Sequence, residues 1–329
     1  MKQRKANPFQ FVFFAMSIAC LSARSAEADY VPDDPSVLAP YGQCHLLGDG
    51  VEAWVLSVSG GRLMRFGPVG GTNLLWNAPA GALPDAGWNN LGGEKTWVGD
   101  MSLWRGFDPK GRRWPPPAWF DQDEFKVDLR PEPPTNLVLR QEANYSSGDW
   151  TVGLERAFRF EGDRLVIRES LLSDSTDDPT PNDPRRVWSV TQVPFAPRLA
   201  ARTLNPRRIS VSGGFPRESA FHGAWAEFDL AGAPEKAALA CDADALAVEG
   251  PAGWLVVSQR ADARFLGAFA EPGRALVYTT GAKPDDPAAA YTELEFVALG
   301  PAAAQEISFR ILPPGRAPWD AEDAAAAAP

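Results

Sequence analysis

Proline and glycine interrupt this chain every few residues, and this restricts its fold more than any other feature. The 329 residues include 31 Pro and 29 Gly, and no stretch keeps a helical period long enough for a helix bundle or a coiled coil. Because 45% of the residues are hydrophobic, the chain can still bury a large core. Short strands joined by turns are therefore the expected building blocks.

Candidate strands follow one another from residue 51 onward. The clearest hairpin joins Thr151–Phe160 to Arg164–Leu171 through Glu161-Gly162-Asp163. A second hairpin signal joins Val51–Val58 to Arg62–Phe66. Further strands are predicted at Asn73–Trp76, Asn136–Glu142, Val187–Val193, Arg208–Ser212, Trp254–Gln259, Arg264–Ala268, Ala275–Thr280, Tyr291–Ala298 and Glu306–Ile311. About a dozen strands predict an all-β, mostly antiparallel sandwich or barrel.

The first 28 residues have the features of a cleaved signal peptide. Basic residues precede the apolar run Phe9–Leu21, and the small-residue site Ala26-Glu27-Ala28 follows it. We therefore expect an exported, periplasmic or extracellular protein. Lipoprotein anchoring through Cys20 is the less favoured alternative. No later run approaches the roughly 20 apolar residues of a transmembrane helix. No internal repeat and no linker divides the rest of the chain, so one domain at 29–315 is expected. The run of five alanines predicts a disordered Ala-rich tail at 316–329.

The charge balance and the scarcity of histidine exclude several functions. Against 32 Lys and Arg stand 42 Asp and Glu, a net charge of −10, so a nucleic-acid partner is not expected. Only His45 and His222 are present, and no zinc spacing, serine-hydrolase elbow or phosphate loop occurs. We expect no metal and no cofactor.

Two cysteines, Cys44 and Cys241, lie outside the signal peptide. Export to an oxidising compartment would allow them to form one disulfide across a very long loop. Two buried free thiols are the alternative.

Tryptophan is concentrated in one part of the chain. Six of the 12 Trp fall between residues 76 and 119 in sequence that looks like loops, among amide, carboxylate and ammonium groups. An indole can stack on the apolar face of a pyranose while such polar groups bind its hydroxyls. The candidate saccharide-binding residues here are Asn90, Glu94, Lys95, Trp97, Trp114, Trp119 and Asp121. Core packing is the alternative for any single Trp, and a surface ion pair is the alternative for Glu94 and Lys95.

Several short motifs, in their order, resemble one known superfamily. Gly60-Gly61-Arg62-Leu63 followed by Asn73-Leu74-Leu75-Trp76 resembles the opening of aldose 1-epimerase (galactose mutarotase)-like proteins. The segment 92–97 (Gly-Gly-Glu-Lys-Thr-Trp), the three prolines after Trp114, and the segments 188–193 and 291–296 are similar to its DUF4380-type branch. This resemblance implies a β-supersandwich with a sugar-binding face.

The resemblance also implies a catalytic pair, which this chain matches only in part. True mutarotases use a His as general acid and a late Glu as general base. The middle strand at 187–193 offers Gln192, which can bind a hydroxyl but cannot donate a proton as an acid. The candidate catalytic residues are therefore His222 and Glu293, although His222 could be structural and Glu293 could simply be solvated.

Three function classes follow. A saccharide-binding protein is the first expectation. An active aldose 1-epimerase-type or other carbohydrate-active enzyme would need an acid and a base near the Trp residues. A structural envelope protein without a ligand would bury them.

Overall fold

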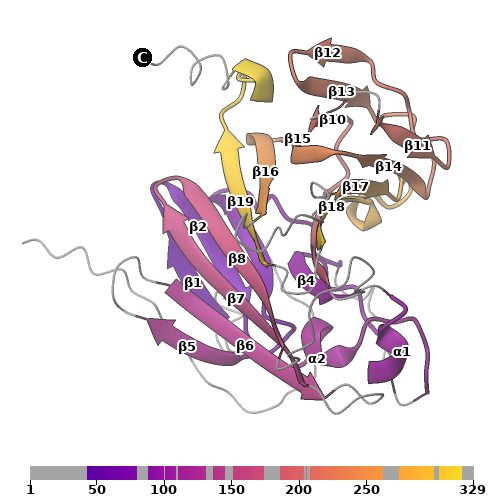
Figure 1. Ribbon diagram of the computed structural model, residues 1–329. Helices are drawn as coiled ribbons and strands as arrows, with labels where there is room; N and C mark the ends of the chain where they lie inside the picture. Colours follow the sequence, from indigo (N-terminus) through magenta and orange to yellow (C-terminus); the bar gives the residue numbers. More distant parts are fainter. Residues whose placement is uncertain are drawn as a thin grey trace, which may run out of the picture.

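A computed structural model describes residues 43–79, 88–99, 101–108, 110–130, 136–144, 151–173, 186–203, 205, 208–261, 274–299 and 304–320. Most of these residues form two antiparallel sheets (Figure 1). The nine-stranded sheet runs in the order β1 (Gln43–Leu47), β2 (Val51–Leu56), β3 (Arg62–Pro68), β4 (Glu94–Val98), β9 (Arg186–Pro194), β18 (Tyr291–Leu299), β17 (Arg274–Thr279), β14 (Ala237–Cys241) and β11 (Ser210–Ser212).

The ten-stranded sheet runs in the order β12 (Ala220–His222), β13 (Trp225–Asp229), β10 (Arg198–Thr203), β15 (Ala243–Gly250), β16 (Gly253–Ala261), β19 (Ala304–Leu312), β8 (Arg164–Ser173), β7 (Thr151–Glu161), β6 (Asn136–Asn144) and β5 (Lys126–Arg130). In Figure 1, β1 and β2 lie near β7 and β8 at one end, and β11 and β14 lie near β10 and β13 at the other. The predicted all-β, mostly antiparallel sandwich is confirmed.

The core lies between the two sheets. Successive side chains of a strand point to opposite faces of its sheet, so every second side chain points toward the other sheet. Phe66 of β3 packs across this layer on Phe309 of β19, with ring centroids 5.7 Å apart. In the predicted β7–β8 hairpin, Phe158 pairs with Ile167, and both are fully buried. Gly162 has φ +64° in the turn, a backbone conformation that favours glycine.

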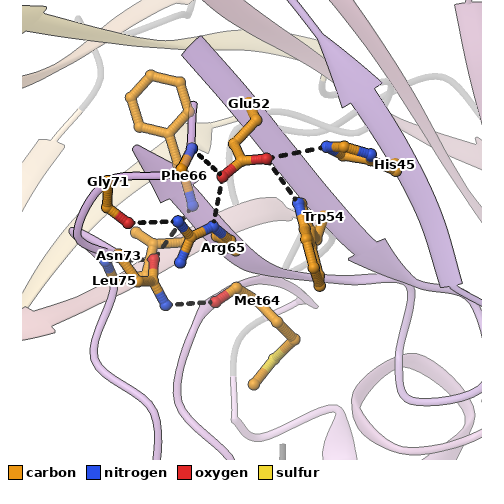
Figure 2. Close-up of polar contacts among 10 residues, drawn as sticks. His45, Glu52, Trp54, Met64, Arg65, Phe66, Gly71, Asn73 and Leu75 are labelled. Carbon is orange, nitrogen blue, oxygen red and sulfur yellow. Dashed lines mark hydrogen bonds and ion pairs between the residues drawn. The ribbon is translucent and has the colours of Figure 1, made fainter. Parts of the chain in front are cut away.

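Two local predictions around the Trp-rich region are wrong. Asn73–Trp76 is not a strand, because the Asn73 side chain replaces ladder bonds. It accepts from the Phe66 and Leu75 amides at 3.2 and 3.1 Å and donates to the Met64 carbonyl at 2.9 Å (Figure 2). Conversely, β4 lies where the sequence predicts a loop. It is buried on both faces, so it lacks the polar alternation that marks a half-exposed strand.

The cysteine pairing is also wrong. Cys241 of β14 is a buried free thiol. Cys44 lies on β1 at one edge of the nine-stranded sheet. Strands β2, β3, β4, β9, β18 and β17 lie between β1 and β14 in that sheet. This separation prevents a Cys44–Cys241 bond.

The predicted tail does not begin at Arg316. Trp319 packs against the Trp254 ring, with centroids 5.9 Å apart, and is part of the described structure. Residues 321–329, the signal-peptide segment 1–28 and the predicted strand Arg264–Ala268 lie outside the described residues. Among the described residues, we find no helix with the length and hydropathy of a transmembrane span.

Candidate functional site

The short strand β4 places neighbouring side chains on opposite faces of the nine-stranded sheet. Glu94 accepts a hydrogen bond from Arg156 of β7, and Thr96 donates one to Glu169 of β8, so both point toward the ten-stranded sheet. Because side chains alternate along a strand, Lys95 and Trp97 point to the other face. We call the first the inner face and the second the outer face.

Strand register brings four polar side chains together on the outer face. Lys95 lies opposite Val190 of β9, which lies opposite Glu295 of β18. In the next outward-pointing row, Gln192 of β9 lies opposite Glu293 of β18. We refer to Lys95, Gln192, Glu293 and Glu295 as the outer-face cluster.

Hydrogen bonding within this cluster is incomplete. Gln192 Nε2 donates to Glu293 Oε2 at 2.9 Å, and Trp188 Nε1 donates to Glu295 Oε2 at 2.9 Å. In the described residues, the buried Oε1 of Gln192 has no hydrogen-bond partner. A buried acceptor without a partner is costly, so this oxygen keeps a hydrogen-bonding capacity that its described neighbours do not fill.

Lys95 is a buried amine with one polar contact. It is 1% exposed, and Nζ donates to Asn90 Oδ1 at 3.2 Å. Nζ also lies 5.0 Å from the ring centroid of Trp97 and 5.8 Å from that of Trp88. Among the described residues, no carboxylate pairs with it within 4.0 Å. Burial, aided by the nearby Arg62 charge, lowers the pKa of Lys95 to about 8.

The pKa values of Glu293 and Glu295 are raised, whereas that of Lys95 is lowered. Burial and repulsion from Glu293 raise the pKa of Glu295 to about 8. Burial likewise raises the pKa of Glu293, against the opposing influence of Lys95 and the Gln192 hydrogen bond. Burial thus disfavours the ionised form of both carboxylates, beside a lysine whose ammonium form is also disfavoured. A lysine and carboxylates whose pKa values have moved toward neutrality are typical of sites that exchange protons.

Aromatic rings surround this cluster. Trp97 packs edge-on against Trp188, with centroids 5.0 Å apart. Trp114 lies 4.9 Å from Trp88 and 6.1 Å from Trp97 between ring centroids, and it is 46% exposed. Trp114 is thus the ring of this group that presents the most surface to solvent. By contrast, Trp119 is buried against Phe107 and Phe120.

Glu52, another carboxylate on the nine-stranded sheet, has hydrogen-bond partners on both of its oxygens. Glu52 of β2 accepts from Arg65 Nε at 2.9 Å, the Gly70 amide at 3.2 Å and Trp54 Nε1 at 3.4 Å, and it contacts His45 Nε2 at 3.0 Å (Figure 2). Burial alone would raise the pKa of Glu52, but these bonds outweigh it and the pKa is lowered. This group ties the β2–β3 hairpin together and leaves no open acceptor for a ligand.

The residues predicted from sequence divide into two groups. Asn90, Lys95, Trp97, Gln192 and Glu293 come together on the outer face, with Trp114 beside them. Glu94 belongs to the inner face, Trp119 to the core, and Asp121 is fully buried beneath the indoles. Sequence reasoning missed Trp188 and Glu295 as site residues, although Glu295 is two residues from Glu293 and Trp188 lies on the same strand face as Gln192.

His222 lies elsewhere. It ends β12, at the edge of the ten-stranded sheet, where Nε2 is 3.0 Å from Glu227 Oε2. Its ring stacks on Trp319 at a centroid distance of 4.0 Å. Glu293 is in the middle of the other sheet, so the structure does not bring the two together. The paired catalytic role predicted for His222 and Glu293 is therefore not supported. Within the described residues, no group of three or more His, Cys, Asp or Glu is arranged as metal ligands.

Comparison with known proteins supports the fold. The chain resembles the Slr1438 protein from Synechocystis sp. PCC 6803, with a TM-score of 0.55 and 12% identity over 87% of this chain and 99% of that one. It also resembles a galactose mutarotase-like protein from Lactobacillus casei ATCC 334, with a TM-score of 0.50 and 10% identity over 82% of this chain and 100% of that one. No family model and no curated protein sequence matches the chain. At these identities the likeness shows a galactose mutarotase-like β-sandwich.

Proposed function

We propose that this protein binds a saccharide on the outer-face cluster. The observation that carries the proposal is the meeting of Lys95, Gln192 and Glu293 on one sheet face, with the buried Gln192 Oε1 left open. The mutarotase-like fold supports a carbohydrate ligand rather than another small molecule.

Each group has a role in this proposal. Trp114 stacks on the apolar face of a sugar ring, because its indole is the exposed one of the group. Gln192 Oε1 accepts a hydrogen bond from a sugar hydroxyl, and Lys95 donates one. Glu293, which is only partly buried, accepts another. Neighbouring rings exclude water and strengthen these bonds.

A binding panel with matched Trp variants tests this proposal. We expect neutral mono- and oligosaccharides to give calorimetric binding to the wild type. Trp114→Ala should weaken it by about 1–3 kcal/mol, taking base–aromatic stacking as a guide. Trp119→Ala is the control, because it removes a core ring and should lower stability by about 3–5 kcal/mol while affinity per folded molecule is retained. Equal affinity in wild type and Trp114→Ala would contradict the assigned stacking role.

Acid–base catalysis of aldose 1-epimerase type is the second candidate, favoured by the shifted lysine and carboxylate pKa values. Lys95 would protonate the ring oxygen while Glu293 takes the proton of the anomeric hydroxyl. The bond between C1 and the ring oxygen then breaks as the C1 carbonyl forms, and reclosure gives either anomer. Lys95 thus acts as the general acid. The strand that would carry the mutarotase His has Gln192 instead, and a glutamine cannot donate a proton as an acid.

Polarimetry on freshly dissolved α-anomers distinguishes the candidates. Mutarotation above the spontaneous rate, lost by about 10²–10⁴-fold in Lys95→Met and Glu293→Gln, would establish the enzyme. His222→Gln and the exposed Lys126→Met are matched controls that should keep the wild-type rate. Binding without turnover supports the binding protein, and neither binding nor turnover favours the structural envelope protein.

Export and the finer family assignment belong to this proposal as well. The basic start, the apolar run and Ala26-Glu27-Ala28 support a mature N-terminus at Asp29. Intact-mass analysis of protein from the culture medium or periplasm should give that mass. A mass that keeps Cys20 with added acyl chains would instead show a lipoprotein. The DUF4380-type assignment is supported by the order of the short motifs alone.

A further inference from the structure

Asp121 accepts hydrogen bonds from three side chains at the back of the site. It ends the short helix α2 (Ala118–Asp121) and is fully buried. Its Oδ1 accepts from Trp97 Nε1 at 2.9 Å and from Arg62 Nη2 at 3.2 Å, and its Oδ2 accepts from Trp88 Nε1 at 2.6 Å. The carboxylate therefore makes no contact with solvent and cannot be the direct sugar ligand that the sequence predicted.

The two indoles bound by Asp121 are those that flank the Lys95 ammonium. Each indole N–H has the same carboxylate as its acceptor, so one group sets the orientation of both rings. The ring faces then lie 5.0 and 5.8 Å from Nζ, within the range of a cation–π interaction. Asp121 is held in turn by Arg62, which also donates to the Gly92 carbonyl at 2.8 Å, three residues before Lys95.

From this geometry we infer that Asp121 is a positioning residue, which fixes Trp88 and Trp97 around Lys95 and balances the Arg62 charge behind the amine. The inference rests on the proposed function, in which Lys95 donates to the sugar. In this inference, Asp121 does not contact the sugar, but it influences the protonation of the Lys95 amine that does.

The charges facing Lys95 make the sign of the effect clear. Arg62 of β3 disfavours the ammonium form, whereas Asp121 of α2 and the two carboxylates of β18 favour it. Asp121→Asn leaves Arg62 less opposed, and because an amide keeps only one acceptor oxygen, one of the two indole N–H groups loses its acceptor. Both changes disfavour the ammonium, so the pKa of Lys95 should fall further.

The test is an NMR pH titration of lysine side chains in protein containing ¹³C-labelled lysine, with Lys95→Met to assign the signal. In Asp121→Asn we expect the apparent pKa of Lys95 to fall by about half a unit, roughly a threefold rise in the ratio of amine to ammonium at neutral pH. Asp123→Asn, an exposed neighbour two residues away, is the control and should leave the titration unchanged.

A second variant covers the case in which Asp121→Asn does not fold. Trp88→Phe keeps an aromatic ring but removes one donor to Asp121, and it should also shift the Lys95 titration and broaden its signal. A folded Asp121→Asn or Trp88→Phe protein that titrates like the wild type would overturn the inference. No saccharide is added, so failure here is distinct from failure of the saccharide binding that tests the proposed function.

Discussion

Glu94 and Lys95 are consecutive residues of one strand, both are buried, and their surroundings differ completely. On the inner face, Glu94 accepts from Arg156 and from Ser189 Oγ at 3.3 Å, and nearby Glu169 accepts from Gln305 at 2.7 Å and from Thr96. On the outer face, Lys95 has one hydrogen bond, and the described residues include no ion-pair partner for it within 4.0 Å.

This difference shows how one strand can serve both structure and chemistry. Inner-face charges lie opposite one another, and their contacts with Arg156 join the two sheets, although burial and the nearby Glu94 still raise the pKa of Glu169 to about 8. On the outer face, Lys95 has no carboxylate within 4.0 Å among the described residues, so burial lowers the pKa of this amine. Lys95 and Gln192 Oε1 are the outer-face groups whose hydrogen bonding a ligand would complete in the proposed function.

Removing the inner arginine should have the largest effect. Arg156→Met leaves Glu94 and Glu169 buried beside each other without their cation, and we expect a loss of about 3–5 kcal/mol in the free energy of unfolding. Denaturant unfolding measures it. Lys95→Met is the comparison, and it should leave stability unchanged or higher because it removes a desolvated ammonium. Equal losses in the two variants would mean that the faces do not differ.

The turn that leads into β4 should be the next most sensitive position. Gly93 has φ +72°, and a Cβ there would lie 2.4 Å from the Leu63 carbonyl oxygen. Gly93→Ala should therefore cost roughly 2–4 kcal/mol, combining left-handed strain with a backbone clash. Gly111→Ala is the control, because Gly111 has φ +64° but open space around its Cβ. Unfolding midpoints that fall equally would show that strain alone matters.

A smaller effect is expected in the pH dependence of stability. The folded pKa of Glu295, about 8, lies above its ordinary value of 4.5. Its stabilising contribution is therefore present below pH 4.5 and is lost as the pH rises toward 8. Glu295→Gln should make this loss of unfolding free energy between pH 5 and pH 8 smaller by roughly 1–2 kcal/mol. The expected effect is reduced because Glu295 titrates together with Glu293.

Glu52→Gln is the matched control for that titration. The pKa of Glu52 is lowered, so its contribution is present at neutral pH and is lost on acidification. The two variants should thus change the pH profile in opposite directions. Urea unfolding at pH 3, pH 5 and pH 8 measures both, because Glu52 acts between pH 3 and pH 5 and Glu295 between pH 5 and pH 8; parallel profiles would contradict the assigned shifts.

The sequence predicts the sheets better than the site. Strands with strong alternation or β-branched residues, such as the β7–β8 hairpin and β18, are predicted within a few residues. Alanine-rich β14 and β15 are not, because alanine is depleted in strands and only burial between neighbours holds it there. Strand β4 escapes prediction because it is covered on both sides.

For the site, residue type indicates Lys95, Gln192 and Glu293, but pairing register is needed to join them. Nothing in the order of residues shows that β4, β9 and β18 are adjacent in the sheet. Nor does the sequence show that Asp121 is turned inward to two indoles while Trp114 remains exposed. His222 could serve as a general acid by its side-chain chemistry, but the strand order places it at the edge of the ten-stranded sheet, away from Glu293.

The most direct test of the contrast between the faces is the pKa of Lys95 in the wild-type protein. An NMR titration of ¹³C-labelled lysine side chains should show one amine that titrates near pH 8 and is absent from Lys95→Met. If the signal that Lys95→Met removes titrated near the ordinary lysine value of 10.5, the outer face would hold no poised amine and the contrast between the two faces of β4 would be contradicted.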